Sequence, residues 1–445
     1  MSKIIDAVSI VMTCGDEIFA IQRQNYLKAF PGYWAPPGGK VEKNDETFFI
    51  HHPVTDGIDA RLFGAAVREG MEELGVDFRE EIKAGRVDRV DFLGLAVTPD
   101  FNPYRFATHF FRFHFKKKVP FVVDTNEAMK AHWMTCPELV KCYEEGKILA
   151  VPPVIKLIET LGRNPDVRKI DDLNFDYDHS SQVPYIENVK GILQIMPLSH
   201  TLPPATRTNA FLIGGILLDP SPRDDAEYEK FKNTLSRFGF SKILITHHHP
   251  DHHERSTRLA AEFNVPMLMS QDTHDRLSRI IPGYFDKVKV EIVKEGDVVT
   301  SWLNHDVLVY EVPGHDRGQI ALASRDMSWF IAGDLFQGVG TVVIGGDEGD
   351  MAEYFRTLEK VITLNPQVIF PSHGIGLGGT NILQNTLDHR RTREQQVMIM
   401  HQQGMSVEQI LEDIYKDVDK ALWPYARMNI EKHLVKLKNE QKIEK

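Results

Sequence analysis

Residues 246–253 concentrate five histidines and one aspartate in eight positions. The segment reads Thr-His-His-His-Pro-Asp-His-His and directly follows the apolar run 243–245. Neutral imidazole and carboxylate groups are ligands that zinc accepts at about 2.0–2.2 Å. A short apolar run of this kind is typical of a buried strand, and a loop at its end is well placed to hold ligands. The segment therefore predicts a transition-metal site and a metal-dependent hydrolase.

Three further apolar runs end in candidate ligands. Residues 307–312 precede Pro-Gly-His315, residues 329–332 precede Gly-Asp334, and residues 368–370 precede Pro-Ser-His373. Each run has a strand-like composition and is closed by proline or glycine. We expect these strand ends to converge on one site, because rigid scaffolds position functional groups on the loops at their ends.

Convergence would create two neighbouring metal sites. The predicted ligands are His247, His249 and His315 for one ion, Asp251, His252 and His373 for the second, and Asp334 as a bridge between them. Two divalent ions about 3.5–4 Å apart can hold a bridging hydroxide, lower the pKa of its parent water toward 7 and polarise the bond to be cut. Imidazole also suits iron and other metals, so two zinc ions are the default rather than the only reading.

The order and spacing of these ligands are similar to those of the metallo-β-lactamase superfamily. Its motif is His-x-His-x-Asp-His, then a histidine after Pro-Gly, an aspartate and a late histidine, and all seven positions are present. Residues 209–213 and 217–219 resemble the first hairpin of that fold, with Asp219 as a carboxylate just outside the ligand set. The resemblance implies an αββα sandwich of two mixed sheets and a proton-relay role for Asp251. The alternative is a histidine-rich surface loop that binds metal adventitiously.

Several positions around the motif differ from the family pattern. His248 and His253 have no ligand role there, and we expect them to pack or to hydrogen-bond behind the ligands. Charged or polar residues follow the second ligand pair and the third histidine, where the family has other types; they are Glu254, Arg255, Ser256, Asp316 and Gln319. We expect these residues to rim the site, which leaves metal binding intact and the substrate open.

The C-terminal tail has a helical pattern. One helix is expected from residues 389–396 to a terminating glycine at Gly404, a second after the N-cap pair Ser406 and Gln409, and a third over 426–437. The tail resembles the winged helix of the lactamase-beta-2-like branch, some of whose members cut single-stranded RNA. Its basic residues are nearly balanced by acidic ones, so a helical cap or a homodimer contact is an equally open reading.

The N-terminal third carries different chemistry. Glu69, Glu72 and Glu73 are spaced by three and four, which places three carboxylates on one face of a helix, and Arg68 is placed to orient one of them. A hard cation such as Mg²⁺, bound through carboxylates and substrate phosphates, would relieve their repulsion. Gly75 would end this helix.

This segment resembles the Nudix box, Arg-Glu-x-x-Glu-Glu-x-Gly. It departs by about fifteen extra residues ahead of Arg68, and Ala60 stands where an upstream glutamate is expected. The candidate substitutes are Asp45, Glu46 and Asp59. The insertion and residues 98–111 are similar to coenzyme A diphosphatases. A Mg²⁺-dependent pyrophosphohydrolase and a site that only binds nucleotide both remain open.

Length and composition agree with a multidomain α/β and α+β protein. We expect a Nudix α/β/α domain over 1–163, a linker over 164–187, a metallo-β-lactamase domain over 188–385 and a winged-helix-like tail over 386–445. Three cysteines give no disulfide framework, and neither a signal peptide nor a membrane-length apolar run is recognisable, which indicates a cytoplasmic protein. A net charge of −11 argues against broad binding to long nucleic acid.

Three functions follow from these patterns. The preferred one is a hydrolase of an ester or thioester, such as an acyl-coenzyme A compound. The second is a single-strand RNA endoribonuclease, and the third is a regulatory protein whose Nudix half senses a nucleotide. Small-molecule nucleotide, coenzyme A or thioester partners are expected, without a membrane.

Overall fold

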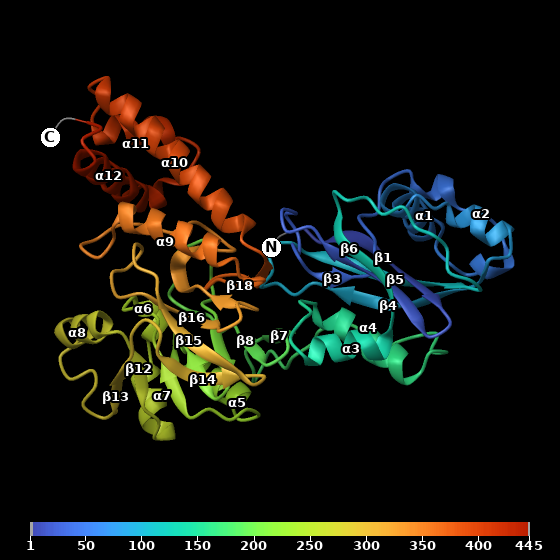
Figure 1. Cartoon of the computed structure of the whole chain (residues 1–445), viewed down its shortest axis with the longest axis horizontal. Helices are drawn as coiled ribbons and strands as arrows, with labels where there is room; N and C mark the ends of the chain where they lie inside the picture. The colour runs from blue at the N-terminus through green and yellow to red at the C-terminus, as the bar shows by residue number, and fades with distance from the viewer. Residues whose placement is uncertain (1–2, 444–445) are drawn as a thin grey trace. The chain divides into compact units, whose positions relative to one another are not determined.

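A computed structural model describes residues 3–443 of the chain (Figure 1), which divides into two compact units. The first contains Met1–Tyr177 and Ile186–Ile192, and the second contains Asp178–Tyr185 and Leu193–Lys445. Within residues 3–443, no helix is both long enough and apolar enough to cross a membrane.

The first unit is built on one mixed sheet with the strand order β3-β2-β1-β5-β4, and β6 also pairs with β2. Its strands are β1 (Ile5–Cys14), β2 (Glu17–Arg23), β3 (Trp34–Ala35), β4 (Val87–Val97), β5 (Phe106–Phe115) and β6 (Ala128–Thr135). Strands β1 and β2 form an N-terminal hairpin, with Cys14 opposite Glu17. Gly15 adopts a φ of 61° in its turn, which glycine tolerates without steric cost.

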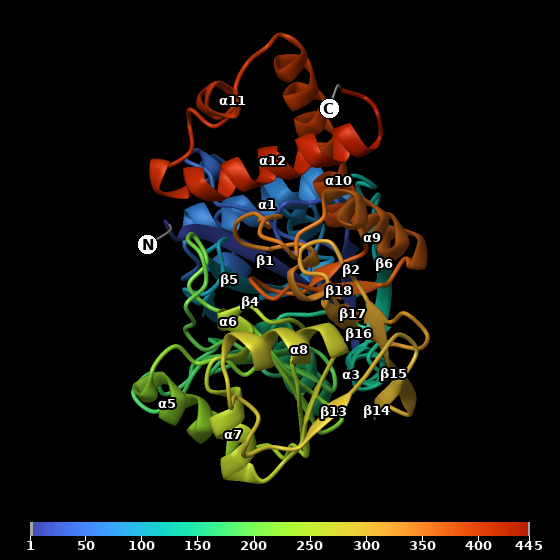
Figure 2. The same cartoon turned by 90° about the vertical axis from the view of Figure 1, so that its left-hand side faces the viewer.

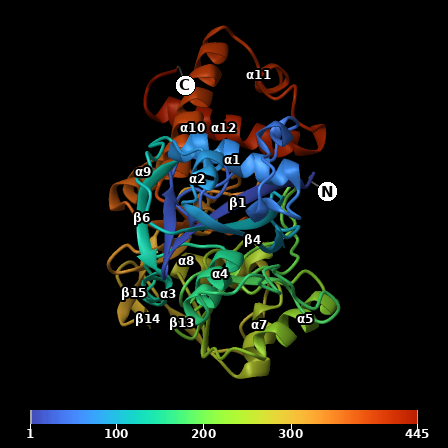
Figure 3. The same ribbon diagram turned by 90° about the vertical axis from the view of Figure 1, so that its right-hand side faces the viewer.

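Helices cover both faces of this sheet (Figure 3). On one face are α1 (Ala60–Leu74) and α2 (Phe78–Lys83), and on the other are α3 (Cys136–Glu144) and α4 (Pro152–Arg163). Asp59 caps the start of α1 by accepting from two main-chain amides, and Gly75 ends it at a φ of 67°. Two apolar clusters, one on each face, fill this α/β/α arrangement.

The expected linker begins with residues that pack. Ile170 and Leu173 are buried in the cluster under α3 and α4, and the Ile170 amide donates to the Leu93 carbonyl at 2.7 Å. Residues 164–177 therefore belong to the first compact unit, because two apolar side chains in a polar stretch are enough to hold it against β4.

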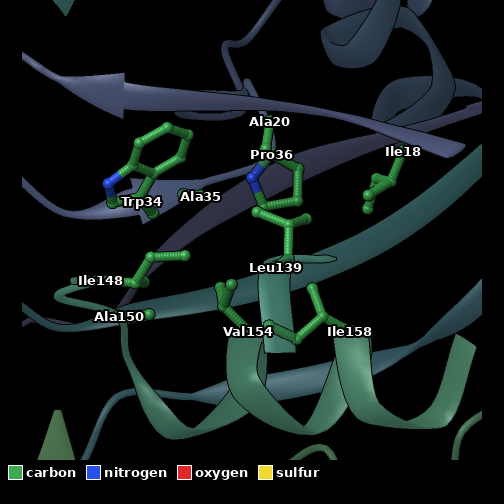
Figure 4. A pocket seen from close by; sticks show the side chains of 10 residues that line it. All are labelled: Ile18, Ala20, Trp34, Ala35, Pro36, Leu139, Ile148, Ala150, Val154 and Ile158. Carbon is green, nitrogen blue, oxygen red and sulfur yellow. The ribbon is translucent and has the colours of Figure 1, made fainter. Parts of the chain in front are cut away.

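A small apolar cavity of about 20 Å³ lies between the sheet and α4 (Figure 4). Its walls are Ile18, Ala20, Trp34, Ala35, Pro36, Leu139, Ile148, Ala150, Val154 and Ile158. A space of this size is barely large enough for one water and its walls present only apolar surface to it, so it is a packing defect rather than a binding site.

The second unit is a sandwich of two mixed sheets. One has the order β13-β12-β11-β10-β9-β8 and the other the order β14-β15-β16-β17-β18-β19. The strands of the first are β8 (Ile192–Ile195), β9 (Ala210–Ile213), β10 (Ile216–Leu218), β11 (Lys242–Leu244), β12 (Met267–Met269) and β13 (Val290–Ile292). Those of the second are β14 (Val298–Trp302), β15 (His305–Glu311), β16 (Ile320–Ser324), β17 (Phe330–Ile331), β18 (Val368–Phe370) and β19 (Leu377–Gly378). The short strand β7 (Tyr185–Val189) lies where the chain passes between units.

Helices form the outer layers of the sandwich (Figure 2). An apolar cluster joins β8–β12 to α5 (Asp225–Leu235), α7 (Ser256–Phe263) and α8 (Gln271–Ile280), and another joins β16–β18 to α9 (Met351–Leu364). The expected strands at 209–213, 243–245, 307–312, 329–332 and 368–370 are all present within a residue or two. The αββα prediction is confirmed.

Within the described residues, the C-terminal tail has three α-helices, of which the first and the third contact α9 and the second packs on the other two (Figures 1 and 2). They are α10 (Asn381–Gln402), α11 (Val407–Ile414) and α12 (Trp423–Asn439). Gly404 follows α10 at a φ of 81°, and Ser406 and Gln409 form the expected capping box of α11. The first helix begins earlier than its sequence pattern indicated, because residues 381–388 continue it on to α9.

Candidate metal centre

The seven predicted ligands lie together where four strands of the sandwich end. Residues 247–249 follow β11, and Asp251 and His252 lie on the short helix α6 (Pro250–His253). The remaining three come after β15, β17 and β18. Their ligand atoms fall into overlapping groups of three within 4.8 Å, among them His247–His249–His315 and Asp251–His252–His373.

The first group has the spacing of a tetrahedral site. The Nδ1 atom of His249 lies 3.0 Å from Nε2 of His247 and 2.9 Å from Nε2 of His315. Nitrogens that each bind one zinc ion at about 2.0–2.1 Å stand about 3.3 Å apart in a tetrahedron. These three imidazoles therefore converge on a point that fits one ion.

The second group surrounds a carboxylate that also reaches the first. The Oδ2 atom of Asp251 lies 3.8 Å from Nε2 of His252 and 3.6 Å from Nε2 of His373. The Oδ1 atom of Asp334 lies 3.6 Å and 3.4 Å from the same two nitrogens. Its other oxygen, Oδ2, lies 3.7 Å from Nε2 of His315. The two oxygens of Asp334 thus face different groups, as a bridging ligand requires.

Two buried atoms in this centre have no hydrogen-bond partner within residues 3–443. They are Nε2 of His252 and Oδ1 of Asp334, which face each other at a distance too long for a hydrogen bond. Buried polar atoms without a partner are costly, so such a pair calls for an explanation. A cation between them would satisfy both, and the residues present fit a metal ion.

The outer nitrogens of the histidines are held by other groups. His252 Nδ1 lies 2.8 Å from Oδ2 of Asp219, and Asp219 also accepts from the amide and hydroxyl of Thr246 at 2.8 and 2.7 Å. His315 Nδ1 lies 2.7 Å from the Val343 carbonyl, and His373 Nδ1 lies 2.8 Å from the Arg207 carbonyl. Such partners fix the tautomer so that Nε2 is free to bind an ion.

The electrostatics of the two groups differ. Burial and the neighbouring histidines hold the pKa of His247 well below its ordinary value, and burial lowers the pKa of His315 to about 4. Burial also opposes charge on His252, but Asp251, Asp334 and Asp219 raise its pKa well above the ordinary value. His247 and His315 of the first group are thus held neutral, whereas the second group is a charged aspartate–histidine cluster.

The two histidines without a ligand role are occupied elsewhere. His253 Nδ1 lies 2.9 Å from the Tyr284 hydroxyl, and His248 Nδ1 lies against Oδ2 of Asp316. Asp316 and Gln319 do not rim the site as expected, because both are buried beneath it. Gln319 donates to the Ala332 carbonyl at 3.1 Å, so the polar replacements in this loop brace the strand ends that carry the ligands.

Glu348 is a candidate site residue that the sequence patterns missed. Its carboxylate lies 3.7 Å from Nε2 of His249 and 3.7 Å from a guanidinium nitrogen of Arg276. It belongs to the irregular Gly-Gly-Asp-Glu-Gly segment ahead of α9, where no apolar run precedes it and no helical spacing relates it to the motif. The two preceding glycines were its only local sign of a constrained loop.

In the first unit, helix α1 presents the Nudix-like residues. Arg68 donates to Glu69 at 2.8 Å, to Glu72 at 3.0 Å and to Asp45 at 2.8 Å. The carboxylate of Glu73 accepts from the Gly38 amide at 3.1 Å. Asp45 is buried and neutralises Arg68, whereas Asp59 only caps the helix and Glu46 is exposed.

The glutamates of α1 lie under a glycine turn. A Cβ at position 39 would stand 2.2 Å from a carboxylate oxygen of Glu69, so only glycine allows this approach. Burial and the charge of Glu69 raise the pKa of Glu73 to about 8. Within the described residues, these glutamates are not among the groups of three possible ligands within 4.8 Å. The crowded carboxylates suit a cation, but a third ligand would have to come from substrate phosphate or water.

Three family models match this chain in sequence order. The NUDIX domain matches residues 3–152, the metallo-beta-lactamase superfamily matches 203–373, and the beta-lactamase associated winged helix domain matches 406–445. A Drosophila melanogaster protein named beta-lactamase-like protein 2 homolog is 28% identical over 53% of this chain and 84% of its own length.

Two further proteins extend the comparison. A hydroxyacylglutathione hydrolase from Bdellovibrio bacteriovorus is 30% identical over 30% of this chain and 49% of its own length. A beta-lactamase domain protein from Burkholderia ambifaria shares the fold, with a TM-score of 0.50 and 20% identity over 60% of this chain and 90% of that chain.

Proposed function

Because this chain belongs to the metallo-β-lactamase superfamily and carries Nudix and winged-helix domains beside its sandwich, we propose that it is a dinuclear metal hydrolase of an ester or thioester. Membership of two hydrolase families makes it an enzyme. The observation that carries the dinuclear proposal is Asp334, whose two oxygens face the two ligand groups.

Each ligand group has a defined task. His247, His249 and His315 would hold one ion, and Asp251, His252 and His373 the other. Two ions held there would supply Lewis acidity and a water of lowered pKa as the nucleophile. Zinc is the metal proposed, since imidazole and carboxylate are its ligands.

We propose that substrate approaches this centre from the side of His249 and Asp251, its more exposed residues. Their side chains are 26% and 15% exposed, whereas that of His252 is fully buried. The Thr208 hydroxyl donates to Oδ2 of Asp251 at 3.1 Å and orients its carboxylate. Asp251 would bind through one oxygen and move a proton to the leaving group.

The thioester preference has two supports. A relative bears the name of a hydrolase of hydroxyacylglutathione, which is an acyl thioester of glutathione. The Nudix half resembles coenzyme A diphosphatases, and acyl-coenzyme A is also a thioester. We propose that this half binds or hydrolyses a nucleoside-diphosphate-linked compound such as coenzyme A, with Mg²⁺ held near Glu69 and Glu73.

The test is hydrolysis of acyl-coenzyme A and acylglutathione by the full chain loaded with zinc. We expect turnover that a chelator removes and zinc restores, and that falls by about 100-fold or more in Asp251→Asn. The matched control is Asp306→Asn, which alters a half-exposed aspartate paired with Arg325 at 2.8 Å. Wild-type hydrolysis no faster than that of Asp251→Asn would refute the proposal.

A single-strand RNA endonuclease is the second candidate, favoured by the winged-helix match at 406–445. The charges of the tail weigh against it, because several of its cations are already paired. Arg391 pairs with Glu359 at 2.6 Å, Arg427 with Glu431 at 2.9 Å and Lys436 with Glu394 at 2.7 Å. Cleavage of a labelled RNA by wild type but not by His249→Ala would establish this activity; cleavage by both would place it outside the metal centre.

A further inference from the structure

The segment between Asp334 and α9 supports a ligand of the metal centre. Residues 336–350 form neither helix nor strand, yet the carbonyl of Val343 within them accepts from Nδ1 of His315 at 2.7 Å. The direction in which His315 presents Nε2 therefore depends on where this carbonyl lies. Something outside the segment must fix it, since no regular hydrogen-bond ladder does.

Residues of the C-terminal tail form hydrogen bonds to the segment on both sides of that carbonyl. Arg390 of α10 donates to the Val342 carbonyl, and the Ile344 amide donates to Oδ1 of Asn429 on α12 at 2.9 Å. Arg390 also donates to the same Oδ1 atom at 3.0 Å. Both side chains are buried, so this network is shielded from water. Two helices thus hold the residues immediately before and after Val343.

The environment of Arg390 is unusual for a buried cation. Within residues 3–443, no carboxylate lies within ion-pair distance of its guanidinium, which bonds to an amide and a carbonyl and lies 5.7 Å from the centre of the Tyr354 ring. A buried charge without an ionic partner costs stability. Apolar side chains would join the tail to α9 more favourably, so stability alone does not explain the residue.

Close packing reinforces the same connection. Position 345 approaches α12 so closely that a Cβ there would meet the Met428 sulfur at 2.8 Å. Tyr354 of α9, over which Arg390 lies, donates its hydroxyl to the Leu335 carbonyl at 2.7 Å, next to Asp334. The network reaches both His315 and the neighbourhood of the bridging aspartate.

We propose that Arg390 and Asn429 are positioning residues of the metal centre: through the main chain of residues 342–344, the tail aims the imidazole of His315. The proposal rests on the proposed function of the centre. It gives the winged-helix-like tail a role within its own chain, distinct from nucleic-acid binding. The tail contributes no ligand. Its removal would nevertheless weaken metal binding, because His315 would lose the contacts that orient it.

The test substitutes Asn429 in the full chain and measures zinc affinity by competition with a chelator. Asn429→Leu removes the acceptor shared by Ile344 and Arg390, and we expect binding of one zinc ion to weaken by about tenfold, as for other changes behind metal ligands. Asn429→Asp keeps an acceptor and gives Arg390 a charge partner, so we expect this variant to retain a zinc affinity close to that of the wild type. If Asn429→Leu does not fold, Arg390→Met can replace it. This variant loses the hydrogen bond to Val342, and we expect the same loss of zinc affinity.

Glu394→Gln is the matched control in the same tail. Glu394 accepts from Lys436 at 2.7 Å and lies 3.2 Å from Nδ1 of His433, in a buried network that does not touch residues 342–344. The Glu394→Gln variant should have lower thermal stability than the wild type but the same zinc affinity. Equal loss of affinity in Glu394→Gln and Asn429→Leu, or normal affinity in Asn429→Leu, would overturn the proposal.

A second readout separates this proposal from the proposed function. Nitrogen NMR of the metal-free protein reports whether the His315 Nδ1 proton is protected from exchange. Asn429→Leu should lose that protection and Glu394→Gln should keep it. If the wild type binds no zinc, the proposed function fails, and protection of this proton still decides whether the tail orients His315.

Discussion

Asp219 shows how a residue outside the ligand set can control a metal centre. It is buried at the end of β10, and its carboxylate accepts from Thr246 and faces His252. Both oxygens are therefore used, and an amide in their place could accept with only one. The histidine would lose the partner that fixes its tautomer.

We predict that Asp219→Asn weakens zinc binding by about 10–100-fold while the chain stays folded. Competition with a chelator measures the affinity, and Asp306→Asn serves as the half-exposed control. Unchanged affinity in Asp219→Asn would show that His252 does not depend on this carboxylate.

The clustering of the seven proposed ligands was predictable from the sequence, whereas the residues behind them were not. His247, His315 and the others stand in a motif at strand ends, where short-range spacing carries the information. Glu348 and Asp316 act through contacts with residues far away in the sequence, which no local pattern records. The resemblance placed Asp316 at the rim, but burial of its loop brings it under the site.

Gly314 connects two elements, because it packs the His315 loop against α9 (Met351–Leu364). Its φ of +131° is unfavourable for other residues, and a Cβ would stand 2.3 Å from the Tyr354 Cα. The Asp350 amide donates to its carbonyl at 2.9 Å, which fixes the start of α9 against the loop.

We predict that Gly314→Ala lowers the free energy of unfolding of the second unit by about 2–4 kcal/mol, through strain and overpacking. Denaturant unfolding of the metal-free protein measures it. The control is Gly239→Ala, where no atom lies within 4 Å of the added Cβ, and we expect a change within about 0.5 kcal/mol. Similar values for the two variants would contradict the role given to this contact.

The tail should loosen in acid. Burial lowers the pKa of His433, with Glu394 partly opposing and Arg390 and Lys436 adding to the effect. Burial raises the pKa of Glu394, but hydrogen bonds from His433 and Lys436 outweigh it and the net pKa is lowered. Unfolding releases both groups to their ordinary values of 6.5 and 4.5.

Since the unfolded tail then binds more protons, its stability is full above pH 6.5 and declines as the pH falls, first through His433 and then through Glu394. Thermal unfolding at pH 7.5 and pH 5 should show a larger loss in the wild type than in His433→Gln. Equal losses would exclude His433 as the source.

Elements with strong local signals were predictable. Apolar runs gave the strands, Ser406 and Gln409 gave the start of α11, and Gly75 gave the end of α1. The start of α10 and the packing of residues 164–177 could not be predicted. Tertiary contacts with α9 and β4 determine them, and these contacts leave no mark in local spacing.

In the whole molecule, domains of two different families with candidate sites share one chain. The order of three domain families was predictable because each carries its own motif, and the matches at 3–152, 203–373 and 406–445 confirm it. The substrates could not be predicted from the sequence, because composition and net charge do not determine the shape of a pocket.

We predict that the two activities are separable. Glu69→Gln should reduce Mg²⁺-dependent hydrolysis of a coenzyme A-type diphosphate by about 100-fold or more and leave thioester hydrolysis unchanged, and Asp251→Asn should do the reverse. Parallel assays of both variants measure this. Loss of both activities from either single substitution would contradict two independent sites.

We propose that seven side chains from four strand ends hold two metal ions. Elemental analysis of the purified full chain after equilibration with zinc tests it most directly. We expect about two zinc ions per chain in the wild type and about one in His373→Ala. Less than one ion per wild-type chain, or an unchanged zinc content after loss of His373, would contradict it.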